Sequence, residues 1–152
     1  MTAFKNIIVP YDFSAHSEAA LKLAAELAEP LGSKIHILFS VHVPLNKFIV
    51  GTPGTVYSAP ASDTSQLIKA AERQLKEVAE NANIPNGWEV HVSQGEDVAE
   101  TMRHDLNKLK PDLIVMGTHG RTGLAHVFLG SVAERTLRHA PCPVLTTKAQ
   151  EK

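Results

Sequence analysis

The chain has 152 residues, of which 15 are Lys or Arg and 16 are Asp or Glu, and its formal net charge is -1. This balance gives no electrostatic footprint for nucleic acid or anionic lipid, so we expect neither as a partner. The single cysteine, Cys142, excludes an internal disulfide framework and a cysteine-based zinc cluster. No apolar run approaches the roughly 18 residues of a membrane span. These features predict one soluble domain, residues 1–152, in the cytoplasm, without membrane insertion.

Short runs rich in Ile and Val alternate with longer stretches whose apolar residues recur three and four apart, which is typical of βαβ units. The first strand is predicted at residues 7–10, followed by a helix that ends at Gly32. The second strand is predicted at 35–43, and the second helix opens with the box-like Asp63-Thr64-Ser65-Gln66. A third strand at 89–93 alternates apolar and polar residues, which favours an edge position.

The third helix is predicted from Asp97 to a point before Pro111, and the strand at 113–116 is apolar throughout, as expected of a strand buried on both faces. A fourth helix is predicted at 132–139. The last strand, Val144 to Thr147, is entered through Pro143, which favours an edge. The predicted fold class is therefore α/β, a doubly wound sheet of five parallel strands with helices on both faces.

Two connections exceed the usual 2 to 6 residues, and we look for function there. One runs over 44–62 and the other over 117–130. The second follows a buried strand, contains glycines at 117, 120, 123 and 130, and leads into a helix. Glycines let backbone N–H groups approach a ligand, and the helix N-terminus adds donors and partial positive charge, so the loop favours an anion. Arg121 and Ser131 would add a charged fork and a hydroxyl.

The spacing Gly117-x2-Gly120-x9-Gly130-Ser131 resembles the nucleotide-binding motif of ATP-binding universal stress proteins. The resemblance extends along the chain, through the segment VPYDFS that begins at Val9, through VHV that begins at Val41, and through PCPV that begins at Pro141. It implies the strand order 3-2-1-4-5 and an ATP site between the first and fourth strands.

The resemblance also implies the site residues. Asp12 and the backbone of Val43 would hold adenine and ribose, with Pro10 and Tyr11 beside them. Met116, Gly117, His119 and Gly120 would line the ribose and α-phosphate. Gly130, Ser131 and Val132, with Arg121, would hold the outer phosphates, and Mg²⁺ or Mn²⁺ would bind mainly through those phosphates. No residue is assigned as catalytic or as a protein metal ligand.

Two functions are compatible with this loop. The first is a stress or signalling module that holds ATP, because the phosphate loop is complete and no set of catalytic residues is evident. The alternative is a slow ATPase or phosphotransferase with Asp12 or His119 as base, although the chain has no GxxxxGK[ST] loop and no kinase-type HRD or DFG set. A flavodoxin would need a hydroxyl-rich phosphate loop after the first strand, and a receiver domain would need clustered acids there.

Simpler structural explanations exist for several of these residues. Ser131 and Glu134 have the spacing of a capping box, and Asp12 could serve the start of the first helix. The eight histidines show no HExxH or paired-ligand spacing, so His36, His42 and His91 are interpreted as polar strand positions.

The resemblance further implies a homodimer that forms through the last strand, Val144 to Thr147. The 44–62 segment is a candidate surface for an unidentified protein partner, or a loop that orders over the nucleotide.

Overall fold

The structure, a computed structural model, describes residues 4–43, 61–119 and 129–149, with the side chains of 61–63 excepted. Five strands form one sheet in the order β3-β2-β1-β4-β5, as predicted. Every pair of neighbouring strands is parallel. Their bounds are Asn6–Pro10 (β1), Lys34–His42 (β2), Trp88–Gly95 (β3), Leu113–Gly117 (β4) and Val144–Thr147 (β5).

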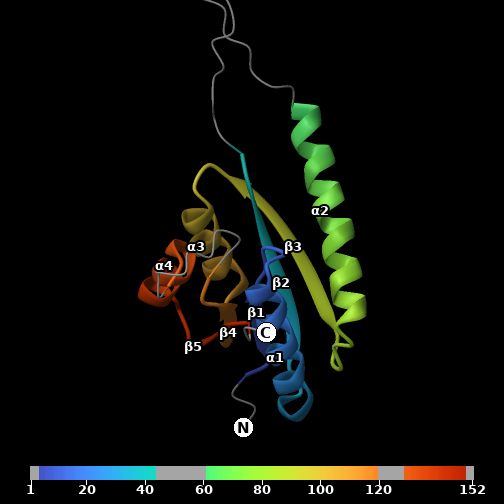
Figure 1. The fold of residues 1–152 in the computed structure, drawn as a ribbon, viewed down its shortest axis with the longest axis vertical. Helices are drawn as coiled ribbons and strands as arrows, with labels where there is room; N and C mark the ends of the chain where they lie inside the picture. The colour runs from blue at the N-terminus through green and yellow to red at the C-terminus, as the bar shows by residue number, and fades with distance from the viewer. Residues whose placement is uncertain (1–3, 44–60, 120–128, 150–152) are drawn as a thin grey trace, which may run out of the picture.

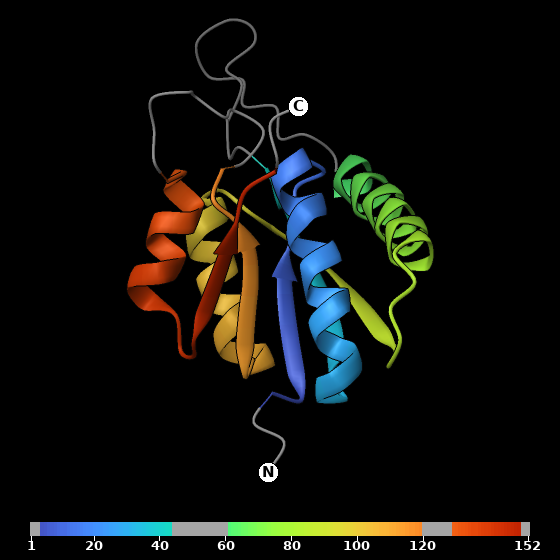
Figure 2. The same ribbon diagram turned by 60° about the horizontal axis from the view of Figure 1, so that its bottom comes forward.

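Four helices connect these strands and cover both faces of the sheet (Figure 1). They are α1 (Ala15–Leu31), α2 (Ala61–Asn81), α3 (Val98–Leu109) and α4 (Ser131–His139). Figure 2 shows β1, β4 and β5 pointing the same way, with α1 in front of the sheet and α3 behind it. The fold is therefore doubly wound, and the central position of β1 follows from crossovers in both directions.

Two apolar cores lie on the two faces of the sheet. Alternation along β1 divides its side chains between them, because Ile7 and Val9 pack with α1 and α2 whereas Ile8 packs with α3 and α4. All three side chains are fully buried. In β4, the run from Leu113 to Met116 is buried on both faces, as its continuous apolar sequence predicts.

The helix ends depend on local capping. Ser14 caps α1 by accepting from Ser17 N, and Asp97 caps α3 by accepting from Ala99 N and Glu100 N. Gly32 ends α1 in the left-handed conformation, at φ 65°, as the sequence predicts.

Several predicted boundaries differ from the structure by one or two residues. The second helix begins at Ala61 rather than at Asp63, so the box-like segment lies inside its first turns. The fourth helix begins at Ser131, and the second strand ends at His42. The 44–62 connection lies outside the described residues, apart from residues 61 and 62, which belong to α2.

Candidate functional site

A pocket lies at the carboxyl ends of β1 and β4, where the order of the strands reverses and where ligands bind in open α/β sheets. Its volume is about 380 Å³, within the usual range for small-molecule sites. Segments far apart in the sequence meet here, because parallel strands bring their carboxyl ends to one edge. The pocket is lined by nine of the twelve residues predicted for the site: Pro10, Tyr11, Asp12, Met116, Gly117, His119, Gly130, Ser131 and Val132.

Of the other three predicted residues, only Val43 is described, and it does not line the pocket. Val43 follows β2, and its N–H donates to the carbonyl of Gly95 at 3.0 Å. Its backbone N–H therefore extends the pairing of β2 with β3. Gly120 and Arg121 lie outside the described residues.

Sequence reasoning missed seven lining residues, most of them apolar: Ser17, Phe39, Ser40, Val98, Met102, Thr118 and Ala133. Phe39 and Met102 fit the apolar spacing of a strand and a helix, so their pattern indicated core and nothing more. Both side chains belong to the apolar cores and also border the pocket, at the ends of β2 and α3 that lie beside it. No local signal in the sequence marks that position.

Asp12 is held at the pocket by the turn between β1 and α1. Its Oδ1 accepts from Ser14 N at 3.0 Å, and its own N–H donates to Ser17 Oγ at 3.3 Å. Between them, Phe13 adopts a positive φ of 64°, which is uncommon for a residue with a side chain and makes the turn tight. The geometry thus places a half-buried carboxylate beside the end of β1.

An aromatic group anchors the same turn. The ring of Phe13 packs edge-on against Tyr11 and against Phe39, with centroids 5.2 Å apart in both pairs. Tyr11 is buried, and its pKa is raised by that burial first and by the charges of Glu18 and Asp12 next. The phenol therefore stays neutral over the physiological range. The packed rings of Tyr11, Phe13 and Phe39 hold the turn that carries Asp12.

The N-terminus of α4 lies at the pocket, and among the described residues no side chain caps it. Gly130 is the N-cap residue and supplies no cap hydrogen bond, whereas α1 and α3 each have one. The first intrahelical bond runs from Glu134 N to the carbonyl of Gly130 at 2.9 Å. The N–H groups of Ser131, Val132 and Ala133 therefore have no acceptor within the helix, and all three residues line the pocket.

The simpler explanation of Ser131 and Glu134 as a capping box does not hold, because the N-cap residue is Gly130. Gly130 is fixed at the helix start by donating its N–H to the carbonyl of Thr118 at 2.7 Å, so Ser131 is already the first helical residue. Glu134 forms an ion pair with Arg138 at 3.0 Å, one turn further along. Neither side chain can thus satisfy the helix start in the way that the pattern indicates.

Gly117 is required where β4 ends against the first turn of α1. A Cβ at this position would lie 2.9 Å from the carbonyl carbon of His16 and 3.0 Å from its oxygen. Backbone atoms cannot move aside as a flexible side chain does. The glycine therefore has a packing role in addition to its place in the pocket wall.

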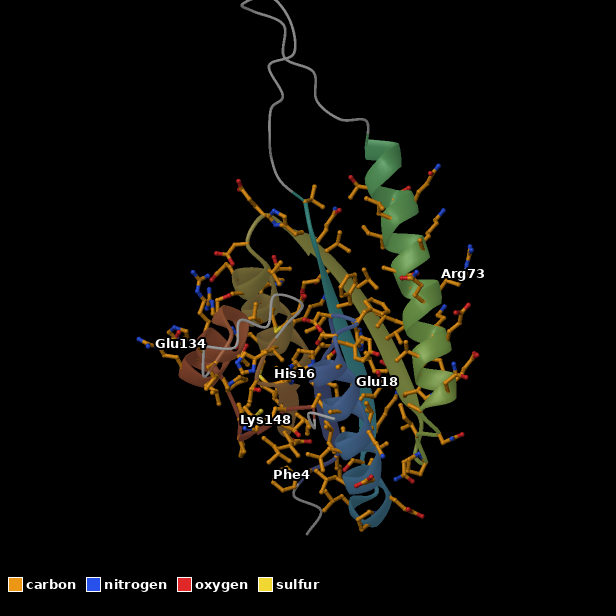
Figure 3. All side chains as sticks on the ribbon, in the orientation of Figure 1. Phe4, His16, Glu18, Arg73, Glu134 and Lys148 are labelled. Atoms are coloured by element: carbon orange, nitrogen blue, oxygen red, sulfur yellow. The ribbon has the colours of Figure 1, made fainter. Side chains whose placement is uncertain are left out.

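Two histidines meet at the rim of the pocket. The rings of His16 and His119 are 5.3 Å apart, and Thr118 Oγ1 lies 2.9 Å from His119 Nδ1. His16 Nδ1 accepts from Ala149 N at 2.9 Å, so the segment after β5 returns to the start of α1. Figure 3 labels His16 beside Lys148 in this region. His16 therefore contacts both the ring of His119 and the segment after β5.

A larger hollow of about 700 Å³ lies between α3 and α4. Its charged side chains are exposed and pair with one another, as in Glu100 with Arg103 and Glu134 with Arg138. It lacks the strand ends and the aromatic wall of the smaller pocket. We therefore take the pocket at β1 and β4 as the candidate site, although the two hollows share Ser131.

Comparison with known families identifies the family of the chain. Residues 3–148 match the model of the universal stress protein family. The chain belongs to the universal stress protein family. A universal stress protein of Methanocaldococcus jannaschii is 34% identical over 154 aligned positions, which cover 98% of this chain and 85% of that relative.

Solved structures agree with this assignment. A universal stress family protein from Burkholderia pseudomallei is 29% identical, with a TM-score of 0.70 over 98% of this chain and 99% of that one. A universal stress protein in complex with cAMP has a TM-score of 0.65 at 21% identity, covering 97% and 98% of the two chains. One from Archaeoglobus fulgidus in complex with dAMP has a TM-score of 0.61 at 18% identity, covering 97% and 100%.

The family and the fold expected from the glycine loop are thus confirmed. Some structural neighbours in the family bind adenine nucleotides. Within the residues that the structure describes, no helix has the length and apolar character needed to cross a membrane.

Proposed function

We propose that this universal stress protein binds ATP in the pocket at the carboxyl ends of β1 and β4, as a nucleotide-dependent stress or signalling module. The observation that carries the proposal is the uncapped N-terminus of α4. Among the described residues, the first-turn N–H groups of Ser131, Val132 and Ala133 have no acceptor, and these residues line the pocket. Such groups favour a phosphate through hydrogen bonds and the helix dipole.

The rest of the pocket suits a nucleoside. Phe39, Val98 and Met102 supply an apolar wall for a planar base, and Asp12 supplies a carboxylate for ribose hydroxyls. A bound adenosine would then extend from this wall towards α4.

The relatives that bind cAMP and dAMP support the same chemistry, because both ligands combine adenine, a sugar and a phosphate. Three phosphates rather than one are proposed from the length of the 117–130 connection. Its glycines and Arg121 would surround the outer phosphates. Mg²⁺ or Mn²⁺ would bind mainly through those phosphates.

We propose in addition a homodimer that forms through β5. The carbonyl of Pro143 accepts from Ile114 N and that of Thr147 from Thr118 N, so by alternation the N–H and C=O of Thr146 face away from the sheet. Leu145 is 38% exposed on the same edge strand. An unpaired edge with an apolar residue supports pairing with a second copy.

The cytoplasmic location and a further protein partner for the 44–62 segment stay predictions of the sequence.

The proposed function is tested by calorimetric titration of nucleotide-stripped protein with ATP, ADP, AMP and adenosine at a fixed Mg²⁺ concentration. We expect micromolar binding of ATP, which corresponds to about 8 kcal/mol, and affinity that falls as phosphates are removed. Equal affinity for ATP and adenosine would reject the role of α4. Absence of binding for the whole series would reject the nucleotide function.

A further inference from the structure

Three side chains with metal-ligating atoms meet at the opposite end of the sheet, on β2 and its edge neighbour β3. The strand register pairs His36 with Glu89 and Leu38 with His91. Residues two apart share a face, so all three polar side chains lie on the face of Leu38, which packs towards α3 and α4. Fifty-five residues separate His36 from His91, so parallel pairing alone brings them together.

The distances between these atoms fit one tetrahedral ion. His36 Nδ1 and His91 Nε2 are 3.1 Å apart, and Glu89 Oε2 lies 3.6 Å from the first nitrogen and 3.7 Å from the second. Zinc bonds of about 2.0–2.2 Å place the ligand atoms of a tetrahedron about 3.3–3.6 Å apart. The three atoms need to shift by only a few tenths of an ångström to share an ion.

Neighbouring residues hold two of these groups in the orientation that binding requires. Asn6 Nδ2 contacts Asp112 Oδ2 at 3.5 Å, which turns Asn6 Oδ1 towards His36 Nε2, 3.3 Å away. When His36 Nε2–H donates to that oxygen, Nδ1 carries the lone pair and faces His91 and Glu89. In metal-binding histidines, a hydrogen bond donated by the ring nitrogen that does not bind the metal fixes the tautomer in this way.

Lys34 orients the carboxylate of Glu89, and burial restricts the side chain of His36. Lys34 Nζ pairs with Glu89 Oε1, which leaves Oε2 as the oxygen nearest the imidazoles. The His36 side chain is only 13% exposed, so the surrounding protein holds the imidazole in place.

We propose that His36 Nδ1, His91 Nε2 and Glu89 Oε2 form a binding site for one divalent transition-metal ion, with Zn²⁺ as the ion that this donor set fits best. Two imidazoles and one carboxylate favour zinc over Mg²⁺ or Ca²⁺, which prefer oxygen ligands. Three protein ligands leave the fourth tetrahedral position for water. The site shares no residue with the pocket at the strand carboxyl ends, so it stands whether or not the chain binds a nucleotide.

An ion at this position would cross-link an edge strand to its neighbour. β3 pairs with β2 on one side only, and the cluster lies near the start of that pairing. Because the ion binds the folded chain, it raises the midpoint of thermal unfolding in proportion to the logarithm of its concentration.

The test uses the full chain without an affinity tag, stripped of metal, and titrated with Zn²⁺ against a chromogenic zinc chelator. We expect one ion per chain with a dissociation constant of micromolar or below. The double variant His36→Gln/His91→Gln should weaken binding at least 100-fold, and Asn6→Ala about 10-fold or more as the loss of an outer partner. The matched control His104→Gln/His139→Gln removes two exposed histidines from α3 and α4 and should bind as the parent does.

A second measurement does not depend on any variant. Co²⁺ added to the parent should give the intense visible absorption of tetrahedral coordination, and Zn²⁺ should abolish it, whereas Mg²⁺ should not. The proposal is overturned if the parent takes up no Zn²⁺ at tens of micromolar, or if its Co²⁺ spectrum is that of the hydrated ion. It is equally overturned if the His36→Gln/His91→Gln variant, shown to be folded by circular dichroism, binds zinc as tightly as the parent.

Discussion

Ser131→Pro isolates the contribution of one backbone N–H to nucleotide binding. Ser131 is the first residue of α4, where proline is well tolerated because its fixed φ suits the helix and the missing N–H has no intrahelical acceptor. The preceding residue, Gly130, has φ −68° and ψ 158°, the extended conformation that a residue before proline prefers. The substitution therefore removes a donor from the pocket at little conformational cost.

The expected loss follows from the charge of the acceptor. A hydrogen bond from a neutral donor to a charged group contributes about 1.5–3 kcal/mol, so the dissociation constant for ATP should rise about 10- to 150-fold. The free energy of unfolding should change by less than about 0.5 kcal/mol, as at other exposed positions. Adenosine carries no phosphate, so any weak affinity for it should not change.

Calorimetric titration of three proteins checks this reasoning. Ser131→Ala is the matched control, because it removes the hydroxyl and keeps the N–H. We expect its affinity for ATP to stay within a few fold of the parent, well above that of Ser131→Pro. If both variants lose affinity equally, the hydroxyl rather than the helix N-terminus binds the phosphate. If Ser131→Pro binds ATP as the parent does while folded, α4 has no part in the site.

Three further predictions concern packing, pH and assembly. Gly117→Ala would place a Cβ against the backbone of His16 and should lower stability by about 1–3 kcal/mol in urea unfolding; an unchanged midpoint would contradict the packing role. Asp97 has a lowered pKa because of its hydrogen bond from Arg135, so its stabilising effect over Asp97→Asn should be complete above its usual pKa of 3.8 and disappear as the pH falls through the lowered value. A constant difference between the two proteins, measured by unfolding across that range, would rule this out. Thr146→Pro removes an outward N–H from the edge strand and should convert the proposed dimer to a monomer in sedimentation, whereas a dimer that survives uses another surface.

Much of the fold follows from local patterns in the sequence. The apolar run of β4 and the alternation in β3 predict a buried strand and an edge strand, because each pattern reflects how many faces are covered. Gly32 predicts the end of α1, since few other residues adopt its left-handed conformation. These features depend on neighbours in the chain, which the sequence displays directly.

The start of α4 shows where local pattern fails. Ser131 and Glu134 have the spacing of a capping box, yet the bond from Gly130 N to the Thr118 carbonyl fixes the chain one residue earlier. That bond joins the two ends of the long 117–130 connection. A tertiary contact thus decides which residue begins the helix and which donors reach the pocket.

The pocket and the proposed metal site both depend on how the strands are paired. Phe39 fits the pattern of a core residue until β2 is placed beside the pocket. His36, Glu89 and His91 have no motif spacing, and only the pairing of β2 with β3 makes them neighbours. Parallel strands are joined by long crossovers and not by a tight turn that would fix their register. The sequence alone therefore cannot bring these residues together.

The most direct test of the nucleotide site is an NMR titration of ¹⁵N-labelled, nucleotide-stripped protein with ATP and Mg²⁺. We predict that the largest amide shifts fall at Asp12, Gly117 and the first turn of α4, with saturation at micromolar ATP. Shifts confined to the hollow between α3 and α4, or a spectrum unchanged at millimolar ATP, would contradict it.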